Sequence, residues 1–259
     1  LVRVGEGSLK SLVVLVVLAV SAYATMRGIT AVARVATVDT VAFTLPMGQD
    51  LPSIAAAVTG QGKASMAAWV GGLVGLLMVG WALARPEGRS ADTLLGGLGV
   101  GAVIVAVWWV SGRLGHLMEH PVTLEEVFLA TNSQRMESLS FVAPVAYGLD
   151  WLILFSDKSK LLTLGIVSSL GVAVGSFVVA RAKGSFRWQG FAGTEDTANH
   201  LVGAVLMGVG GVTAMGCTVG QGLSGISTLA LGSFIAVGGI VAGAVVALRY
   251  QVWRLDRMA

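Results

Sequence analysis

Charged residues are scarce in this sequence. Asp, Glu, Lys and Arg together make up 12% of its 259 residues, whereas they are about a quarter of an ordinary soluble domain. Hydrophobic residues make up 55%, and the mean hydropathy is +0.81. This composition excludes a soluble globular protein. It predicts an all-α, polytopic membrane protein, because helices satisfy their own backbone hydrogen bonds within the bilayer.

Cysteine and nucleotide-binding motifs are also scarce or absent. The single cysteine, Cys217, excludes a disulfide within the chain and leaves the redox compartment undecided. Neither a Walker A motif nor a Rossmann fingerprint occurs, so the sequence predicts no ATP or NAD cofactor. The net charge of +3 comes from Lys and Arg in loops and therefore indicates membrane topology and no nucleic-acid partner.

Five apolar segments are long enough to cross a bilayer, which takes about 20 helical residues. They are Leu9 to Met26, Ala64 to Ala84, Thr93 to Ser111, Leu161 to Ala180 and Leu229 to Leu248. Two others, Phe141 to Phe155 and Leu201 to Met215, are too short to span comfortably, and whether the second crosses or turns back is left open. Polar residues and prolines interrupt Gly28 to Gly62, which predicts interfacial or re-entrant structure.

Basic and acidic residues fall in different loops. Arg85 and Arg89 predict a cytoplasmic loop between the second and third spans, and the arginines after Leu248 predict a cytoplasmic C-terminus. The acidic loop from Glu119 to Glu137 is then expected on the opposite side.

The stretch from Gly208 to Gly225 combines glycines, small hydroxyls, one amide and Cys217. Each glycine costs about 1 kcal/mol in a helix interior relative to alanine, so the sequence predicts a helix break here. Such a break in a bilayer is tolerated where the freed backbone groups face protein or a polar cavity. The alternative for a lone cysteine is a small buried hydrophobic residue.

The run G-G-V-T-A-M-G-C-T-V-G-Q-G-L-S-G-I-S-T-L-A-L-G-S-F, preceded by F-R-W-Q-G-F, resembles the C-terminal part of the YeeE/YedE family of membrane transporters for sulfur compounds such as thiosulfate. The resemblance extends through E-S-L-S-F-V-A-P at Glu137 to Pro144 and through L-V-R-V-G-E-G-S-L-K-S-L at the start. It therefore covers most of the chain.

This resemblance implies a transporter of thiosulfate or a related small sulfur-containing anion in the bacterial inner membrane, without enzymatic activity. It implies that the anion passes thiol and backbone groups, and the expected substrate-binding residues are Cys217, Gly216, Thr218, Gly220, Gln221, Gly222 and Ser224. It also implies contact with the lipid bilayer and a TusA-like sulfur-carrier protein as a partner at the cytoplasmic face.

Members of the family carry cysteines in both halves, whereas this chain has one and begins with Leu1. We therefore expect residues 1–259 to form a single transmembrane transporter domain that lacks its N-terminal part. A weak internal echo pairs Gly7-Ser8 with Gly232-Ser233 and favours an inverted repeat with broken helices that meet at mid-membrane.

A second hypothesis rests on His116-Leu-Met-Glu119-His120, which spells H-x-x-E-H. In metallopeptidases this pattern places two histidines on one helical face to bind zinc, with the glutamate as base. Glu125, Glu126 or Glu137 would have to supply a third ligand. The alternative is a cluster at the outer end of a helix that Pro121 stops.

Two other features have weaker interpretations. Asp150 is the one candidate for a carboxylate within a membrane segment, and Trp151 beside it favours the membrane interface instead. Small-xxx-small pairs such as Gly71/Gly75 and Gly171/Gly175 predict close helix packing.

Overall fold

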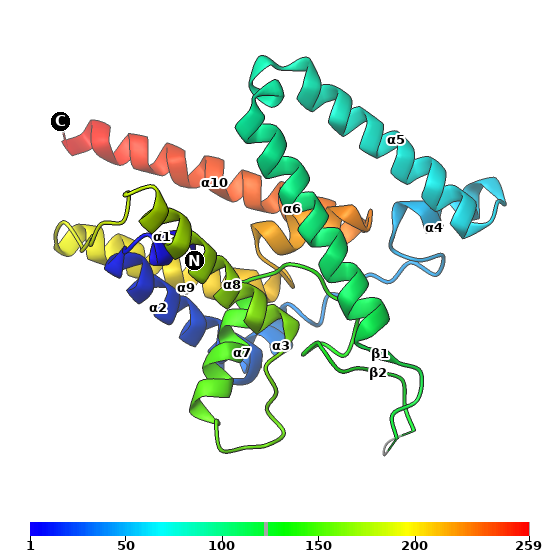
Figure 1. Cartoon of the computed structure of the whole chain (residues 1–259), viewed down its shortest axis with the longest axis horizontal. Coiled ribbons are helices and arrows are strands. Elements are labelled where there is room, and N and C mark those ends of the chain that lie inside the picture. Colours follow the sequence, from blue (N-terminus) through cyan, green and yellow to red (C-terminus); the bar gives the residue numbers. More distant parts are fainter. Residues whose placement is uncertain (122–123, 259) are drawn as a thin grey trace. The chain divides into compact units, whose positions relative to one another are not determined.

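The computed structural model describes residues 1–121 and 124–258, so Val122, Thr123 and Ala259 lie outside the described residues (Figure 1). The chain divides into two compact units. The first comprises Leu1–Ala42 and Val103–Gly220, and the second comprises Phe43–Ala102 and Gln221–Ala259. The chain passes between the units three times: after Ala42, inside helix α6 (Ala91–Trp109) and inside the π-helix η3 (Gly220–Gly225).

The first unit is mainly helical. Its elements are α1 (Val2–Gly5), α2 (Leu9–Arg27), α3 (Ile29–Thr37), the π-helix η2 (Val110–Leu114), β1 (His116–Leu117), β2 (Val127–Phe128), α7 (Val142–Ile153), α8 (Leu164–Ala182) and α9 (Thr194–Thr213). Strands β1 and β2 form an antiparallel pair in which His116 faces Phe128. In the second unit lie α4 (Leu51–Thr59), α5 (Lys63–Ala84), η1 (Pro86–Arg89) and α10 (Leu231–Met258).

Five of the described helical segments are long and apolar enough to cross a membrane: Leu9–Arg27, Lys63–Ala84, Ala91–Leu114, Leu164–Ala182 and Leu231–Arg254. Each contains most of a span predicted from the sequence. The prediction of an all-α polytopic membrane protein is confirmed. Between Gly28 and Gly62 only the short helices α3 and α4 form, as expected for a segment that does not span.

The two short segments have different outcomes. Helix α7 has 12 residues, which confirms the expected short helix near Pro144. Helix α9 has 20 residues and begins at Thr194, so the prediction of a short helix starting at Leu201 was wrong. Glu195 and Asp196 lie in its first turn, where carboxylates interact favourably with the positive end of the helix dipole. The same charges lower the hydropathy and conceal the helix in the sequence.

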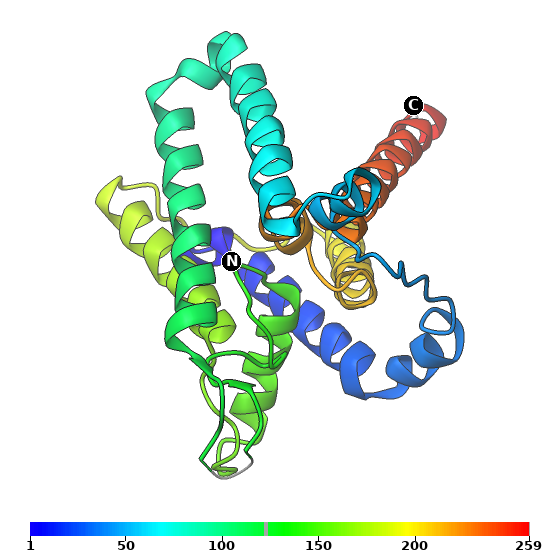
Figure 2. The ribbon, with the colours of Figure 1, turned by 90° about the vertical axis from the view of Figure 1, so that its right-hand side faces the viewer.

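Helices α2, α7 and α9 enclose the core of the first unit, and α2 lies along α9 (Figures 1 and 2). The buried side chains are small or branched: Leu18, Ala22, Val142, Ala146, Ala204 and Val212. Gly208 lets the α9 backbone approach α2 so closely that an added Cβ would lie 2.8 Å from the Leu18 carbonyl oxygen. A Cβ added at Gly211 would likewise lie 2.8 Å from a methyl carbon of Val142. Small residues allow this packing where no hydrophobic force drives helices together.

The predicted role of the small-xxx-small pairs is not observed within the described residues. No atom lies within 4 Å of a Cβ added at Gly171 or Gly175, and only the Leu229 side chain, at 3.9 Å, approaches one at Gly71. Close helix approach occurs at Gly208 and Gly211 instead.

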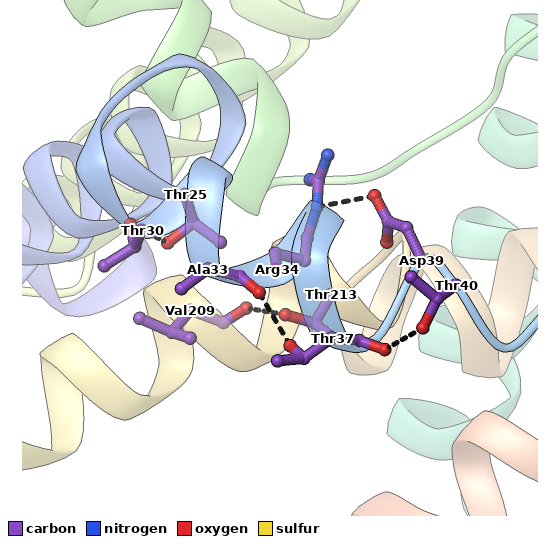
Figure 3. A network of polar contacts seen from close by, with 9 residues as sticks. All are labelled: Thr25, Thr30, Ala33, Arg34, Thr37, Asp39, Thr40, Val209 and Thr213. Carbon is purple, nitrogen blue, oxygen red and sulfur yellow. Dashed lines mark hydrogen bonds and ion pairs between the residues drawn. The ribbon is translucent and has the colours of Figure 1, made fainter.

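Hydroxyl groups satisfy backbone carbonyls around the turn from α2 to α3 (Figure 3). Thr25 and Thr30 share a hydrogen bond of 3.0 Å across this turn, and Arg34 pairs with Asp39 at 3.2 Å. At the end of α9, the Thr213 hydroxyl donates to the Val209 carbonyl at 2.8 Å. Such back-bonding adds no new tertiary contact but keeps polar groups paired inside an apolar environment.

In the second unit, α4 has a well-defined start and end. The Asp50 carboxylate accepts hydrogen bonds from the backbone N–H of Ser53 at 3.1 Å and from its hydroxyl at 2.7 Å. The helix ends at Gly60, whose φ of 72° is the left-handed geometry that favours glycine. The Ser53 hydroxyl, and then Lys63, hold the pKa of Asp50 below its usual value against the opposing effect of burial.

Candidate functional site

Cys217 lies directly after the predicted helix break. Helix α9 ends at Thr213, and Met215 takes a positive φ of 54°. The Gly216 N–H then donates to the Gly211 carbonyl at 2.8 Å, which closes the helix end. Cys217 has no regular secondary structure, and helical turns resume at Thr218. The predicted interruption between Val209 and Ser224 is confirmed.

The thiol caps the helical turns that follow it. The Gly220 N–H donates to the Cys217 Sγ at 3.4 Å, so sulfur occupies the position that a serine or aspartate oxygen usually takes at a helix start. The first N–H groups of a helix lack partners within that helix and carry the positive end of its dipole. The thiol therefore lies beside donors that favour an anion.

A cavity of about 490 Å³ opens in front of the thiol. Cys217, Thr218 and Val219 line it together with residues of α1, α2 and α7 and one residue each of α8 and α9. Most of the lining is apolar, and its polar groups include Ser11 and Arg3. Cys217 is only partly buried and also packs against the core cluster of α2, α7 and α9. It thus serves as a packing residue and as part of a cavity wall.

The segments that carry the family resemblance meet at this cavity. Val142, from the run Glu137 to Pro144, lines it and contacts Gly211. The segment at the start of the chain contributes Val2 and Ser11. The F-R-W-Q-G-F run is hydrogen-bonded to this first segment, because the Arg187 N–H donates to the Glu6 carbonyl at 3.1 Å and the Leu9 N–H donates to that of Gln189 at 2.9 Å.

Four of the seven predicted site residues lie together in the first unit. Cys217 and Thr218 line the cavity, whereas Gly216 and Gly220 shape the backbone around them. A Cβ added at Gly220 would lie 2.7 Å from the Ser140 hydroxyl, so a side chain cannot be added there without displacing this neighbour. Ser140 thereby links the Glu137 to Pro144 run to the cysteine turn.

Gln221, Gly222 and Ser224 belong to the second unit. The Gln221 amide oxygen accepts a hydrogen bond of 2.6 Å from the Ser233 hydroxyl at the start of α10, and Gly222 faces Val237 at 3.7 Å. Ser224 is buried, with 6% of its surface exposed. None of these three lines the cavity in front of Cys217. Their assignment to a substrate site stays a prediction.

The sequence did not identify several cavity residues. Phe141, Val145, Leu18 and Met207 line the cavity, yet each is an ordinary apolar residue in a helix or directly before one. The only available signal was that Phe141 and its neighbours fall inside the Glu137 to Pro144 run of the resemblance. Periodicity alone cannot distinguish such residues from a packed core.

Asp150 is buried among protein groups, with 3% of its surface exposed. Its carboxylate accepts hydrogen bonds from the Tyr23 hydroxyl at 2.7 Å and from Lys160 Nζ at 2.6 Å. Asp150 thereby ties α7 to α2 and to the segment before α8. Its expected position at the membrane interface stays a prediction.

The H-x-x-E-H run does not form a helix. His116 lies in strand β1, where its Nε2 is 2.7 Å from Glu126 Oε1 and its ring stacks on Phe128. His120 lies in the turn that follows, with its N–H bonded to the Glu125 carbonyl at 3.0 Å. Across the described residues, no three His, Cys, Asp or Glu side chains are grouped as metal ligands. The single helical face that the zinc hypothesis needs is not present.

With this geometry in view, comparison with known families assigns the chain to a class of membrane protein. Residues 1–246 match the family described as sulphur transport, so the chain belongs to that family. The resemblance to YeeE/YedE transporters is confirmed. The printed description of this family is one of transport and names no enzymatic reaction.

Two curated relatives have the printed name thiosulfate transporter TsuA. The protein from Escherichia coli strain K12 is 36% identical over 95 residues, which are 37% of this chain and 26% of the relative. The protein from Spirochaeta thermophila is 36% identical over 67 residues, which are 26% of this chain and 20% of the relative. The chain therefore matches 26% of the length of the Escherichia coli relative and 20% of that of the Spirochaeta thermophila relative.

Proposed function

We propose that this protein moves thiosulfate or a related small sulfur-containing anion across a membrane, and that the anion contacts Cys217 on its path. The observation that carries the proposal is the convergence of three separate segments on the cavity in front of the thiol. Membership in the sulphur transport family supports the substrate class. The printed names of the two relatives support thiosulfate in particular.

The chemistry of the cavity fits a solute that must bind and then leave. A thiol is a weak donor and a soft acceptor, so it can contact the sulfur end of thiosulfate without a fixed opposite charge. Backbone N–H groups at the helical turn after Cys217 favour the charged oxygens. Arg3 is the charged side chain of the cavity lining. Weak binding of this kind allows release, which conduction requires.

No covalent bond changes in this mechanism. The anion approaches the thiol, exchanges part of its hydration for the donors at the helical turn and moves on. A persulfide intermediate is the less favoured variant, because it would need a separate acceptor to release the sulfur. Gly216 and Gly220 act by keeping the backbone close to the passing ion.

The remaining parts of the proposal concern the assembly. We place the protein in the inner membrane, with Arg85 to Asp92 and the C-terminus on the cytoplasmic side, on the basis of the distribution of Lys and Arg. Residues 1–259 act in this proposal as one transporter domain, although they fold as two compact units. A TusA-like carrier protein is the proposed acceptor at the cytoplasmic face.

The internal echo fits the same proposal. Ser8 and Ser233, which the echo pairs, are both buried, with 4% and 6% of their surface exposed. Ser8 caps the start of α2, and Ser233 lies in the first turn of α10. Both serines therefore lie at the start of a long apolar helix, as a repeat would require.

Uptake by proteoliposomes tests the function directly. Vesicles containing the purified full chain should accumulate ³⁵S-labelled thiosulfate faster than empty vesicles, and excess unlabelled thiosulfate should compete. Excess sulfate, which has the same charge but no soft sulfur, should compete less well. Accumulation no faster than in empty vesicles would contradict the proposal, and equal competition by sulfate would contradict the role given to sulfur.

A further inference from the structure

A second cavity in the first unit has a different chemical character. It has a volume of about 220 Å³ and lies at the C-terminal ends of α2 and α7. Its polar lining includes Arg27 from α2, Tyr147 from α7, and Thr131, Asn132, Gln134 and Lys160 from the connecting segments. Cys217 and the residues around it are not among its lining.

The charges around this cavity do not cancel. Asp150 also lines it, and the ion pair with Lys160 at 2.6 Å compensates one positive charge. The Tyr23 hydroxyl uses a second acceptor position of the same carboxylate. Arg27 has no side-chain hydrogen bond or ion pair to another residue of the described chain. The three charged groups of the lining therefore leave one positive charge in excess.

Neutral hydrogen-bond donors complete the lining. Asn132 and Gln134 carry amide N–H groups, and Tyr147 and Thr131 carry hydroxyls. A guanidinium surrounded by such donors matches an oxyanion, because arginine presents several N–H groups in a planar fork. A cation would meet Arg27 and Lys160, and an apolar ligand would leave these polar groups without partners.

We propose that this cavity binds a small soluble oxyanion at a site distinct from the Cys217 cavity. Helices α2 and α7 connect the two sites, since the first half of each lines the thiol cavity and the last residues of each line the charged one. Buried core residues, including Ala22 and Ala146, lie between them on the same helices. If the proposed transport function holds, the charged cavity collects the anion before or after its passage at Cys217.

Only the link to transport rests on the proposed function. Anion binding to purified protein can be measured whether or not the chain transports anything. An anionic lipid headgroup offers similar oxygens, so the experiment must separate it from a free ion. Both tests are made on the full chain in nanodiscs.

The experiment measures equilibrium binding of ³⁵S-labelled thiosulfate in nanodiscs of neutral phosphatidylcholine. Arg27→Gln should weaken binding by about tenfold or more, because a charge-assisted hydrogen bond is lost. Asp150→Asn should tighten binding, since it keeps an acceptor for Tyr23 but releases the charge of Lys160. Lys158→Gln is the matched control, because Lys158 is an exposed lysine of the same segment outside the lining.

The outcomes separate the alternatives. Unchanged binding in Arg27→Gln, or weaker binding in Asp150→Asn, would overturn the site. Loss of thiosulfate binding when phosphatidylglycerol replaces part of the phosphatidylcholine, with Arg27→Gln no longer different, would assign the cavity to a lipid headgroup and overturn the soluble-anion assignment. Binding that persists in Cys217→Ala supports two distinct sites, and binding that disappears there contradicts them. If binding is weaker in Arg27→Gln and tighter in Asp150→Asn but proteoliposomes show no uptake, the anion site is supported and the proposed transport function is contradicted.

Discussion

The two cavities of the first unit share helices but differ in their chemistry. The thiol cavity is mostly apolar, and the partly buried thiol of Cys217 is its distinctive group. The charged cavity is smaller and is lined by two cations, a buried carboxylate and several neutral donors. One short helix, α7, thus lines an apolar cavity with its first residues and a charged cavity with residues nearer its end.

This contrast suggests a different role for each cavity: the charged one captures the anion, and the thiol cavity lets it pass. Fixed positive charge attracts an anion from solution, whereas a nearly neutral passage binds it weakly enough to let it go. A transporter with only the first kind of site would retain the anion, and one with only the second would seldom capture it.

The largest effect is expected from breaking the buried ion pair. Asp150→Ala leaves Lys160 without its partner and removes the acceptor for Tyr23, and loss of one partner of a buried pair costs roughly 3–5 kcal/mol. The free energy of unfolding, measured by denaturation of the purified protein in detergent, should fall accordingly. Asp150→Asn keeps the acceptor and should lose clearly less. Equal losses in both variants would mean that the hydrogen bond from Tyr23 adds nothing and that loss of the charge alone accounts for the effect.

A smaller loss is expected where α9 approaches α2. The Cβ of Gly208→Ala would lie 2.8 Å from the Leu18 carbonyl oxygen, and forcing the helices apart costs about 1–3 kcal/mol. Gly203→Ala on the same helix meets no atom within 4 Å, so it should leave stability unchanged or raise it by up to about 1 kcal/mol. Thermal unfolding of both variants checks that Gly208→Ala lowers the stability and Gly203→Ala does not. A stable Gly208→Ala protein would contradict the close packing.

In the second unit, Asp50 should contribute a pH-dependent cap to α4. Replacing an N-cap aspartate by alanine costs about 1 kcal/mol. Because the folded pKa of Asp50 is lowered, mainly by the Ser53 hydroxyl, this contribution is complete above the unfolded pKa and is lost as the pH falls through the folded pKa. Unfolding of the wild type and of Asp50→Asn between pH 7 and acid should therefore converge. A constant difference across that range would exclude the charge as its source.

The smallest effect is expected from a test of the topology, whose labelled positions lie outside both cavities. Single cysteines introduced at Ser90 and at Glu125 in a Cys217→Ala background should react with a membrane-impermeant maleimide from opposite sides. Ser90 precedes α6, and Glu125 is exposed in the acidic loop after it. Labelling of both from the same side would contradict the predicted orientation of the loops.

Much of the fold could be predicted from the sequence, because apolar length directly reflects the thickness of a bilayer. The five spans and the break before Cys217 follow from segment length and glycine content. The start of α9 could not be found in this way, because Glu195 and Asp196 stabilise the helix while lowering its hydropathy. Glycine spacing also failed, since close approach depends on the facing helix and occurs at Gly208 and not at Gly171.

The site could be predicted only in part. Cys217 and Thr218 were found from local composition, but the walls opposite them are apolar residues that only the fold brings near. The charged cavity depends on residues from Arg27 to Lys160 that are distant in sequence. No local pattern predicts that Asp150 pairs with both Tyr23 and Lys160.

Thiosulfate uptake by a cysteine-free protein tests the central claim most directly. Cys217→Ala removes the only sulfhydryl, and Cys217→Ser replaces a soft sulfur with a harder, better-hydrated oxygen while keeping a donor. Both variants should insert and express at near-normal levels, yet lose most of the ³⁵S-thiosulfate uptake by proteoliposomes. Ser11→Ala, which alters a hydroxyl of the same cavity, is the control and should keep most of the uptake. Uptake by Cys217→Ala at the wild-type rate would show that the thiol is only a packing residue and would contradict the account.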